Sequence, residues 1–214
     1  MKLQTRLIIL FLSLTCSFRL ADAQYGYRYG YQYVPGPDAY THHGLFISGD
    51  LGVGGINYKD SLGITGGAGD FNLKIGGTVA PNFIISGDLI SVQSANPDVT
   101  QNKGPKAGTD YGNNGFGFSM DLIGIGATYY FMPANVFLSG TLGTGYFTFH
   151  QVGEDDQFSN NGLAFQAEVG KEWWVSPNWG LGIGLVFLDM NAKWSSAETG
   201  NGSFLGLMFN STFN

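Results

Sequence analysis

Short stretches in which apolar and polar residues alternate recur along the chain after residue 44. The clearest copies are Phe-Ile-Ser-Gly-Asp-Leu at 46–51 and Ile-Ile-Ser-Gly-Asp-Leu at 84–89, with a looser copy at 137–142 and a weaker echo at 179–185. Successive side chains of a strand point to opposite faces. One face of each copy is therefore apolar or Gly, and the other is small and polar. The repeated unit is a β-strand.

Turn residues divide the rest of the chain into further strands. The pattern predicts strands at 44–58, 71–80, 83–93, 116–131, 136–150, 162–175, 179–190 and 202–213, separated alternately by longer loops (59–70, 94–115, 150–161, 191–201) and by short turns with Pro and Asn. Strands that follow one another in this way pair antiparallel, and eight strands can close into a barrel filled by side chains. The sequence thus predicts an all-β fold, an eight-stranded antiparallel up-and-down transmembrane β-barrel.

The membrane assignment rests on which face points outward. Only 12% of the 214 residues are charged and 15% are aromatic, whereas the exterior of a soluble barrel would carry many Lys and Glu. The polar face suits a narrow lumen, and Lys74 is its one clear cation. The opposite face suits lipid, because hydrocarbon offers no hydrogen bonds and only a closed sheet satisfies its own backbone there. The predicted polar face comprises Ser48, Asp50, Asn72, Thr78, Ser86, Asp88, Ser119, Asp121, Ser139, Thr141, Gln166, Glu168, Asn210 and Thr212, and the predicted outer face includes Ile47, Leu89, Leu122 and Leu138.

Two sets of residues are candidates for special roles. A polar network in the lumen is predicted from Asp50, Lys74, Asp88, Asp121 and Glu168. It serves either as a hydrogen-bonded plug or as a cation-preferring water path, since buried charges must be paired or wet. An interfacial aromatic girdle is predicted beside the short turns, from Tyr129, Tyr130, Phe131, Trp173, Trp174 and Trp179.

The N-terminal segment has the pattern of a secretory signal at residues 1–23, with Lys2 and Arg6, an apolar run at 7–14 and Ala-Asp-Ala at 21–23. Cys16, the single cysteine, lies within it; lipidation there is the competing interpretation. Residues 24–43, rich in Tyr, Gly and Pro, are interpreted as a flexible periplasmic leader, and 44–214 as the barrel. Removal of the signal leaves seven basic and fifteen acidic residues, a net charge of −8, which argues against nucleic acid as a partner.

Three features resemble the small outer-membrane β-barrel proteins of diderm bacteria, the OmpA-transmembrane, OmpX and OmpW-like group. They are the repeated strands, the segment Gly-Lys-Glu-Trp-Trp-Val-Ser-Pro-Asn-Trp-Gly at 170–180, and the last strand at 205–213. The resemblance implies an integral protein of the bacterial outer membrane, surrounded by outer-membrane lipid. It also implies an assembly signal at Phe209 and Phe213 that the barrel-assembly machinery reads, although Asn214 follows Phe213 here.

The sequence constrains the function of the protein less than its fold. The leading hypothesis is a structural or surface-interaction role, in which the external loops make the contacts. A narrow, porin-like passive channel and a soluble periplasmic, lipocalin-like ligand-binding barrel are the alternatives. No enzyme is predicted, because His150 beside Glu154 has no catalytic signature around it. No cofactor or metal is predicted either, since adjacent His42 and His43 would face opposite ways in a strand.

Overall fold

The computed structural model describes residues 40–101, 108, 110–112, 115–194 and 198–214. The predicted signal and residues 24–39 of the predicted leader lie outside the described residues. The strands are β1 (Leu45–Lys59), β2 (Leu62–Ala80), β3 (Phe83–Ala95), β4 (Asp98–Gln101), β5 (Asp110–Gly112), β6 (Phe116–Phe131), β7 (Val136–Gln151), β8 (Gln157–Phe158), β9 (Gly162–Ser176), β10 (Trp179–Lys193) and β11 (Thr199–Phe213).

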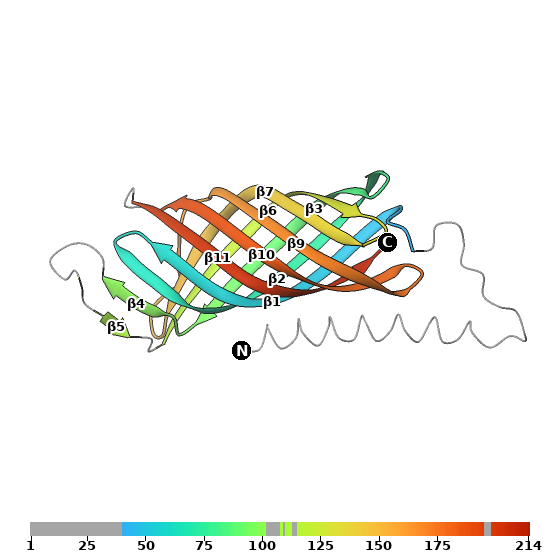
Figure 1. Cartoon of the computed structure of the whole chain (residues 1–214). Coiled ribbons are helices and arrows are strands. Elements are labelled where there is room, and N and C mark those ends of the chain that lie inside the picture. The colour runs from blue at the N-terminus through green and yellow to red at the C-terminus, as the bar shows by residue number, and fades with distance from the viewer. Residues whose placement is uncertain (1–39, 102–107, 109, 113–114, 195–197) are drawn as a thin grey trace, which may run out of the picture. The chain divides into compact units, whose positions relative to one another are not determined.

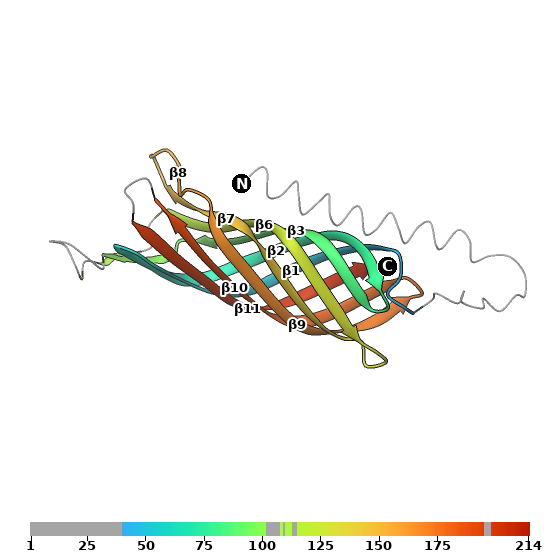
Figure 2. The same ribbon diagram turned by 90° about the horizontal axis from the view of Figure 1, so that it is seen from above.

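Eight long strands close into a barrel. Each of β1, β2, β3, β6, β7, β9, β10 and β11 pairs antiparallel with the next, and β11 returns to pair with β1 from Ile47–Phe213 to Lys59–Asn201. The strands run obliquely around the barrel, as Figures 1 and 2 show. Because the sheet has no free edge along this circuit, its backbone hydrogen bonds are satisfied internally. The predicted all-β, eight-stranded up-and-down barrel is confirmed.

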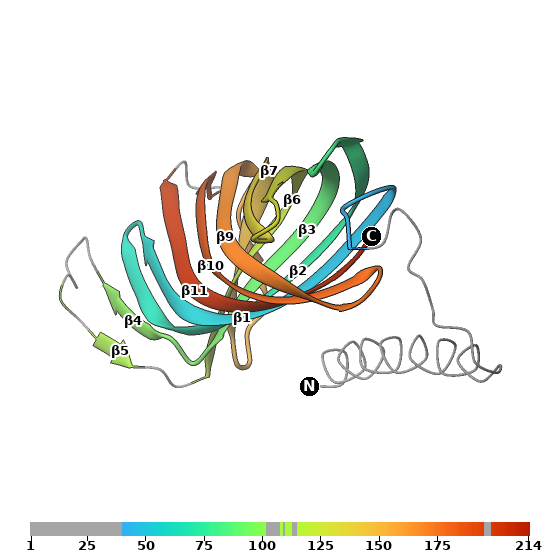
Figure 3. The ribbon, with the colours of Figure 1, turned by 45° about the vertical axis from the view of Figure 1, so that its right-hand side comes forward.

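The two ends of the barrel differ. Short turns join β2 to β3, β6 to β7 and β9 to β10 at one end, here called the turn end. The first and last described residues lie there too, because the Tyr40 amide donates to the carbonyl of Pro177 and the Asn214 amide to that of Asn178. The longer connections lie at the opposite end, the loop end, where β4 and β5 extend the sheet beyond the barrel (Figure 3).

The prediction of a loop at 59–70 is wrong. β2 begins at Leu62, and a tight turn joins it to β1, in which Asp60 Oδ1 accepts from the Leu62 amide at 2.5 Å. The glycines that suggested a loop lie within a strand that pairs with β1 on one side and, at its start, with β4 on the other. Ile64 and Ala68 anchor this part of β2 in the barrel interior, where both are buried.

An outward-facing apolar belt surrounds the part of the barrel nearest the turn end. In β1, β6, β10 and β11 the belt spans nine residues, at 45–53, 123–131, 179–187 and 205–213. Its side chains are largely exposed, for example Val53 and Ile125, each at 70%. A strand that crosses a membrane at a tilt of about 45° needs about 9–11 residues, so the belt has the height of the hydrocarbon layer.

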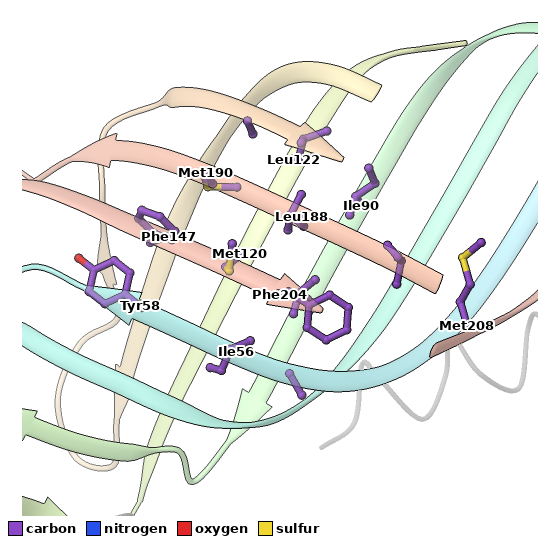
Figure 4. Close-up of a cluster of buried hydrophobic side chains, with 14 of the residues drawn as sticks. Ile56, Tyr58, Ile90, Met120, Leu122, Phe147, Leu188, Met190, Phe204 and Met208 are labelled. Atoms are coloured by element: carbon purple, nitrogen blue, oxygen red, sulfur yellow. The ribbon is translucent and has the colours of Figure 1, made fainter. Parts of the chain in front are cut away.

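Polarity reverses above the belt. Toward the loop end the outward side chains become polar, as at Asn57, Ser91, Asp121, Asp189 and Ser203. The barrel interior there is packed with a cluster of apolar side chains, most of which are labelled in Figure 4; Met208, also labelled, lies apart from them at the level of the belt. The cluster includes Ile56, Tyr58, Ile90, Met120, Leu122, Phe147, Leu188, Met190 and Phe204. This end of the barrel is built like a water-soluble protein, and the belt end is built like a membrane protein.

No helix in the described part of the chain is long and apolar enough to cross a membrane.

Candidate functional site

A network of polar side chains fills the interior at the level of the belt. At its centre the Lys74 ammonium of β2 donates to Glu168 Oε2 of β9 and lies 3.6 Å from Asp50 Oδ2 of β1. All three side chains are buried. Alternation places them here, because residues 48, 50 and 52 of β1 face the same side as 72 and 74 of β2. The single ammonium therefore joins three strands in a medium with little water.

Hydroxyl groups support the carboxylates around this centre. Ser48 Oγ donates to Asp50 Oδ1 at 2.9 Å, and Ser86 Oγ donates to Asp88 Oδ1 at 2.6 Å. The repeated Ser-Gly-Asp thus makes the same contact once in β1 and once in β3, each time between a serine and the aspartate two residues later. Thr141 Oγ1 donates to the other oxygen of Asp88 at 2.5 Å. In each copy of the repeat, the serine hydroxyl stabilises a carboxylate in the barrel interior.

Glu172 organises a second cluster nearer the turn end. Its Oε1 accepts from Tyr130 Oη at 2.9 Å, Asn210 Nδ2 at 2.5 Å and Thr212 Oγ1 at 2.8 Å. Three strands, β6, β9 and β11, meet at one oxygen, and Glu172 is only 1% exposed. Neither Glu172 nor Asp70, which is also buried in the interior, was among the predicted network residues. Alternation was the available signal, because Glu172 is four positions after Glu168 and Asp70 two before Asn72.

His42 closes the turn end from inside. Its ring stacks on Tyr130 with centroids 3.4 Å apart and lies 4.9 Å from the ring of Trp174, and its Nε2 is 2.8 Å from Asn135 Oδ1. Complete burial lowers the pKa of His42 below its ordinary value, with the Asn135 bond opposing that effect. Within the predicted leader, His42 therefore packs into the barrel, whereas Tyr40 and His43 are exposed.

The prediction that Asp121 faces the lumen is wrong. On β6 the inward residues are Phe118, Met120 and Leu122, and Asp121 points outward, where Ser91 and Ser119 donate to it at 2.6 Å and 2.9 Å. Leu122, expected outside, is 3% exposed. The error has a physical cause: this part of β6 lies above the belt, where the polar side of a strand faces water. Asp50, Lys74, Asp88 and Glu168 lie inside.

The prediction of an interfacial position is also wrong for two of the six girdle residues. Tyr130 is buried against Glu172 and His42, and Trp174 faces the interior beside His42. Both occupy inward positions of their strands, next to outward aromatic neighbours. Tyr129, Phe131 and Trp173 are 42–51% exposed on the outer surface. Trp179 has the same outward orientation and its ring lies 6.0 Å from that of Phe213. Phe209 faces outward at 48% exposure.

The interior leaves little room for a ligand. One cavity, lined by Ser48, Asp50, Lys74, Glu168, Glu172 and Asn210 among others, has space for about one water molecule. Gly145 does not widen the lumen, because a Cβ at this position would come within 2.4 Å of Met190 Cε. Among the described residues, no group of three or more His, Cys, Asp or Glu is arranged to hold a metal ion.

Comparison with solved structures agrees with the β-barrel fold described above. No protein-family model and no curated protein matches the chain. Neisserial surface protein A has a similar structure, with a TM-score of 0.50 and 16% identity over 78% of this chain and 95% of that one. Ail, the attachment invasion locus protein of Yersinia pestis, gives 0.44 at 16% identity (78% and 99% covered), and OprG of Pseudomonas aeruginosa gives 0.45 at 14% (82% and 99%).

The chain therefore shares the small, closed β-barrel fold of Neisserial surface protein A. At these identities the comparisons speak for the fold alone, and the predicted resemblance is confirmed at that level.

Proposed function

We propose that the chain is an integral protein of the bacterial outer membrane with a structural and surface-contact role, and that its barrel does not conduct. The observation that carries the proposal is the combination of an outward apolar belt with an interior that is closely packed among the described residues. The belt matches the hydrocarbon thickness, and the interior cavity beside Lys74 has space for about one water molecule.

The arrangement of the interior favours this role over a channel. A solute that entered from the turn end would meet His42 and Glu172, then the Lys74 centre, and then the apolar cluster around Phe147 and Phe204. Passage requires the ion pair to break and the apolar cluster to open at the same time. Each event exposes buried groups at substantial cost.

A soluble lipocalin-like barrel is disfavoured by the outer surface. Val53, Ile125 and Leu205 are 62–70% exposed, and they belong to a continuous belt rather than to scattered positions. Apolar patches of this extent mark a surface that meets something other than water. Lipid is the partner that a closed ring of such side chains fits.

Topology and assembly follow as part of the proposal. With the turn end in the periplasm, the leader emerges there and the longer connections face outside, which is the usual arrangement of such barrels. Residues 1–23 act as the secretory signal, Trp173 and Tyr129 contribute to the periplasmic girdle, and Phe209 and Phe213 provide the signal for the barrel-assembly machinery. No catalytic role and no nucleic-acid partner is proposed.

Conductance separates the two membrane hypotheses. Purified barrel, shown to be folded by its faster migration before boiling, is added to planar lipid bilayers under voltage. We expect no discrete current steps at protein levels where a porin control gives many. Reproducible steps, altered by Lys74→Met, would establish the channel instead.

A further inference from the structure

One part of the surface above the apolar belt departs from the polar pattern. Tyr146 of β7, Phe158 of β8 and Leu163 of β9 face outward with exposed fractions of 36%, 59% and 65%. The rings of Tyr146 and Phe158 lie 6.2 Å apart. We call these three residues the aromatic seam. It is continuous with the belt along β9, where Phe165 and Val169 also face outward with exposed fractions of 43% and 46%.

Equivalent positions elsewhere on the barrel are polar. Tyr146 is ten positions along β7 from Val136, and Ser203 is ten positions from Phe213 on β11. Ser203 pairs with Asn57 on one side and Asp189 on the other, so three neighbouring strands are polar at this height. The seam is therefore a local upward extension of the belt over β7, β8 and β9.

The backbone holds Phe158 at this position. Phe158 pairs with Thr148 of β7. The next residue, Ser159, is held by two hydrogen bonds to Phe147. Its amide donates to the Phe147 carbonyl at 3.0 Å, and its Oγ accepts from the Phe147 amide at 2.9 Å. The Asn160 amide donates to the carbonyl of Lys193 at 2.8 Å. A phenylalanine side chain is thus fixed on the outer wall with more than half of its surface uncovered.

We propose that the aromatic seam is a lipid-binding surface, and that the return arm of the 151–161 hairpin lies in the interface of the outer leaflet. The occupant is lipid because the seam continues the belt without a polar break along β9. Aromatic rings prefer this interfacial depth. The acidic residues Glu154, Asp155 and Asp156 at the hairpin tip are exposed, which keeps the tip in water while Phe158 and Tyr146 contact lipid. The inference rests on the proposed membrane location.

Site-directed spin labelling tests the proposal. In a Cys16→Ser background, which removes the only native cysteine, single cysteines are introduced as F158C, L142C and S203C. Each variant is folded into phosphatidylcholine vesicles, checked by gel mobility before and after boiling, and labelled with a nitroxide. Collision rates are measured with oxygen, which concentrates in lipid, and with a water-soluble nickel chelate. S203C, at the height of Tyr146 on the polar side of the barrel, is the control above the belt, and L142C is the control within the belt.

We expect the oxygen-to-nickel ratio at position 158 to resemble that at 142 and to exceed that at 203 several-fold. A ratio at 158 equal to that at 203 would overturn the proposal. A label at 158 shielded from both reagents would also overturn it, because protein rather than lipid would then cover the seam. If position 142 itself reports water, the membrane location proposed above fails, and the seam assignment fails with it for that separate reason.

Discussion

Lys74 and Glu168 form an ion pair across the barrel interior although they are 94 positions apart in the sequence. Their strands, β2 and β9, are not neighbours in the sheet. The pair therefore spans the lumen and braces one wall against another. Asp50 lies 3.6 Å from the same ammonium, so the positive charge of Lys74 compensates the negative charges of two carboxylates. Loss of that single cation leaves both acids buried and unpaired.

Lys74→Met should accordingly destabilise the barrel strongly. Removing one partner of a buried ion pair costs about 3–5 kcal/mol, and we expect a decrease of that size in the free energy of unfolding. Urea titration of the folded protein in detergent, read by gel mobility, measures it. Lys171→Met is the matched control, because Lys171 is only partly buried on the outer surface, where it donates to the Ala134 carbonyl. Equal effects of the two variants would contradict the bracing role.

Asp88 and Asp121 should respond differently to the same substitution. Asp88→Ala removes the acceptor for the buried hydroxyls of Ser86 and Thr141, and unsatisfied buried groups cost about 1–3 kcal/mol each. Asp121→Ala affects a half-buried carboxylate on the outer wall, and we expect a change within about 0.5 kcal/mol. Unfolding free energies of the two variants check this. A large effect at Asp121 would place that residue in the structural core after all.

Gly143→Ala should destabilise the wall of the barrel. A Cβ at Gly143 would lie 2.1 Å from the carbonyl oxygen of Ile123 in β6. Backbone cannot yield as a flexible side chain does, so we expect a loss of about 1–3 kcal/mol, as for other overpacked sites. Gly67→Ala is the control, since nothing lies within 4 Å of its added Cβ. If Gly143→Ala unfolds at the same urea concentration as the wild type, the close approach of β6 and β7 is incorrect.

His42 should make the turn end sensitive to acid. Because burial lowers its pKa from 6.5, the unfolded chain binds a proton at a higher pH than the folded barrel does. The stability that neutral His42 contributes is therefore present above about pH 6.5 and is lost as the pH falls through the lowered folded-state pKa. The loss of unfolding free energy between pH 7.5 and pH 5 should be smaller in His42→Gln than in wild type. His43→Gln, at an exposed position, should keep the wild-type difference. A wild-type difference that His42→Gln leaves unchanged would refute this assignment.

The alternation of polar and apolar residues predicted eight strands and their closure into a barrel, but it missed the first part of β2. It also placed Asp50, Lys74, Asp88 and Glu168 correctly inside, because these residues lie at the height of the belt. The rule that polar residues face inward failed for Asp121, where the barrel rises above the belt and its polarity reverses. The height of a residue relative to the belt depends on the register between strands, which a single strand's pattern does not contain.

Tyr130 and Trp174 illustrate a second limit of sequence reasoning. Each has an aromatic neighbour in the chain, Tyr129 or Trp173, and only one member of each pair can face lipid. The inward member packs against Glu172 or His42, contacts between strands far apart in the sequence. Alternation could have separated the two members, but clustering of aromatic residues by itself could not. Similarly, the Gly-rich start of β2 forms a strand because β1 and β4 pair with it.

The proposed function depends on a membrane around the apolar belt of the closed barrel. Cell fractionation followed by electrophoresis with and without boiling tests it most directly. We expect the protein in the outer-membrane fraction, resistant to extraction by alkaline carbonate, with faster migration before boiling than after. Recovery in the soluble fraction, with a mobility that boiling does not change, would contradict the account.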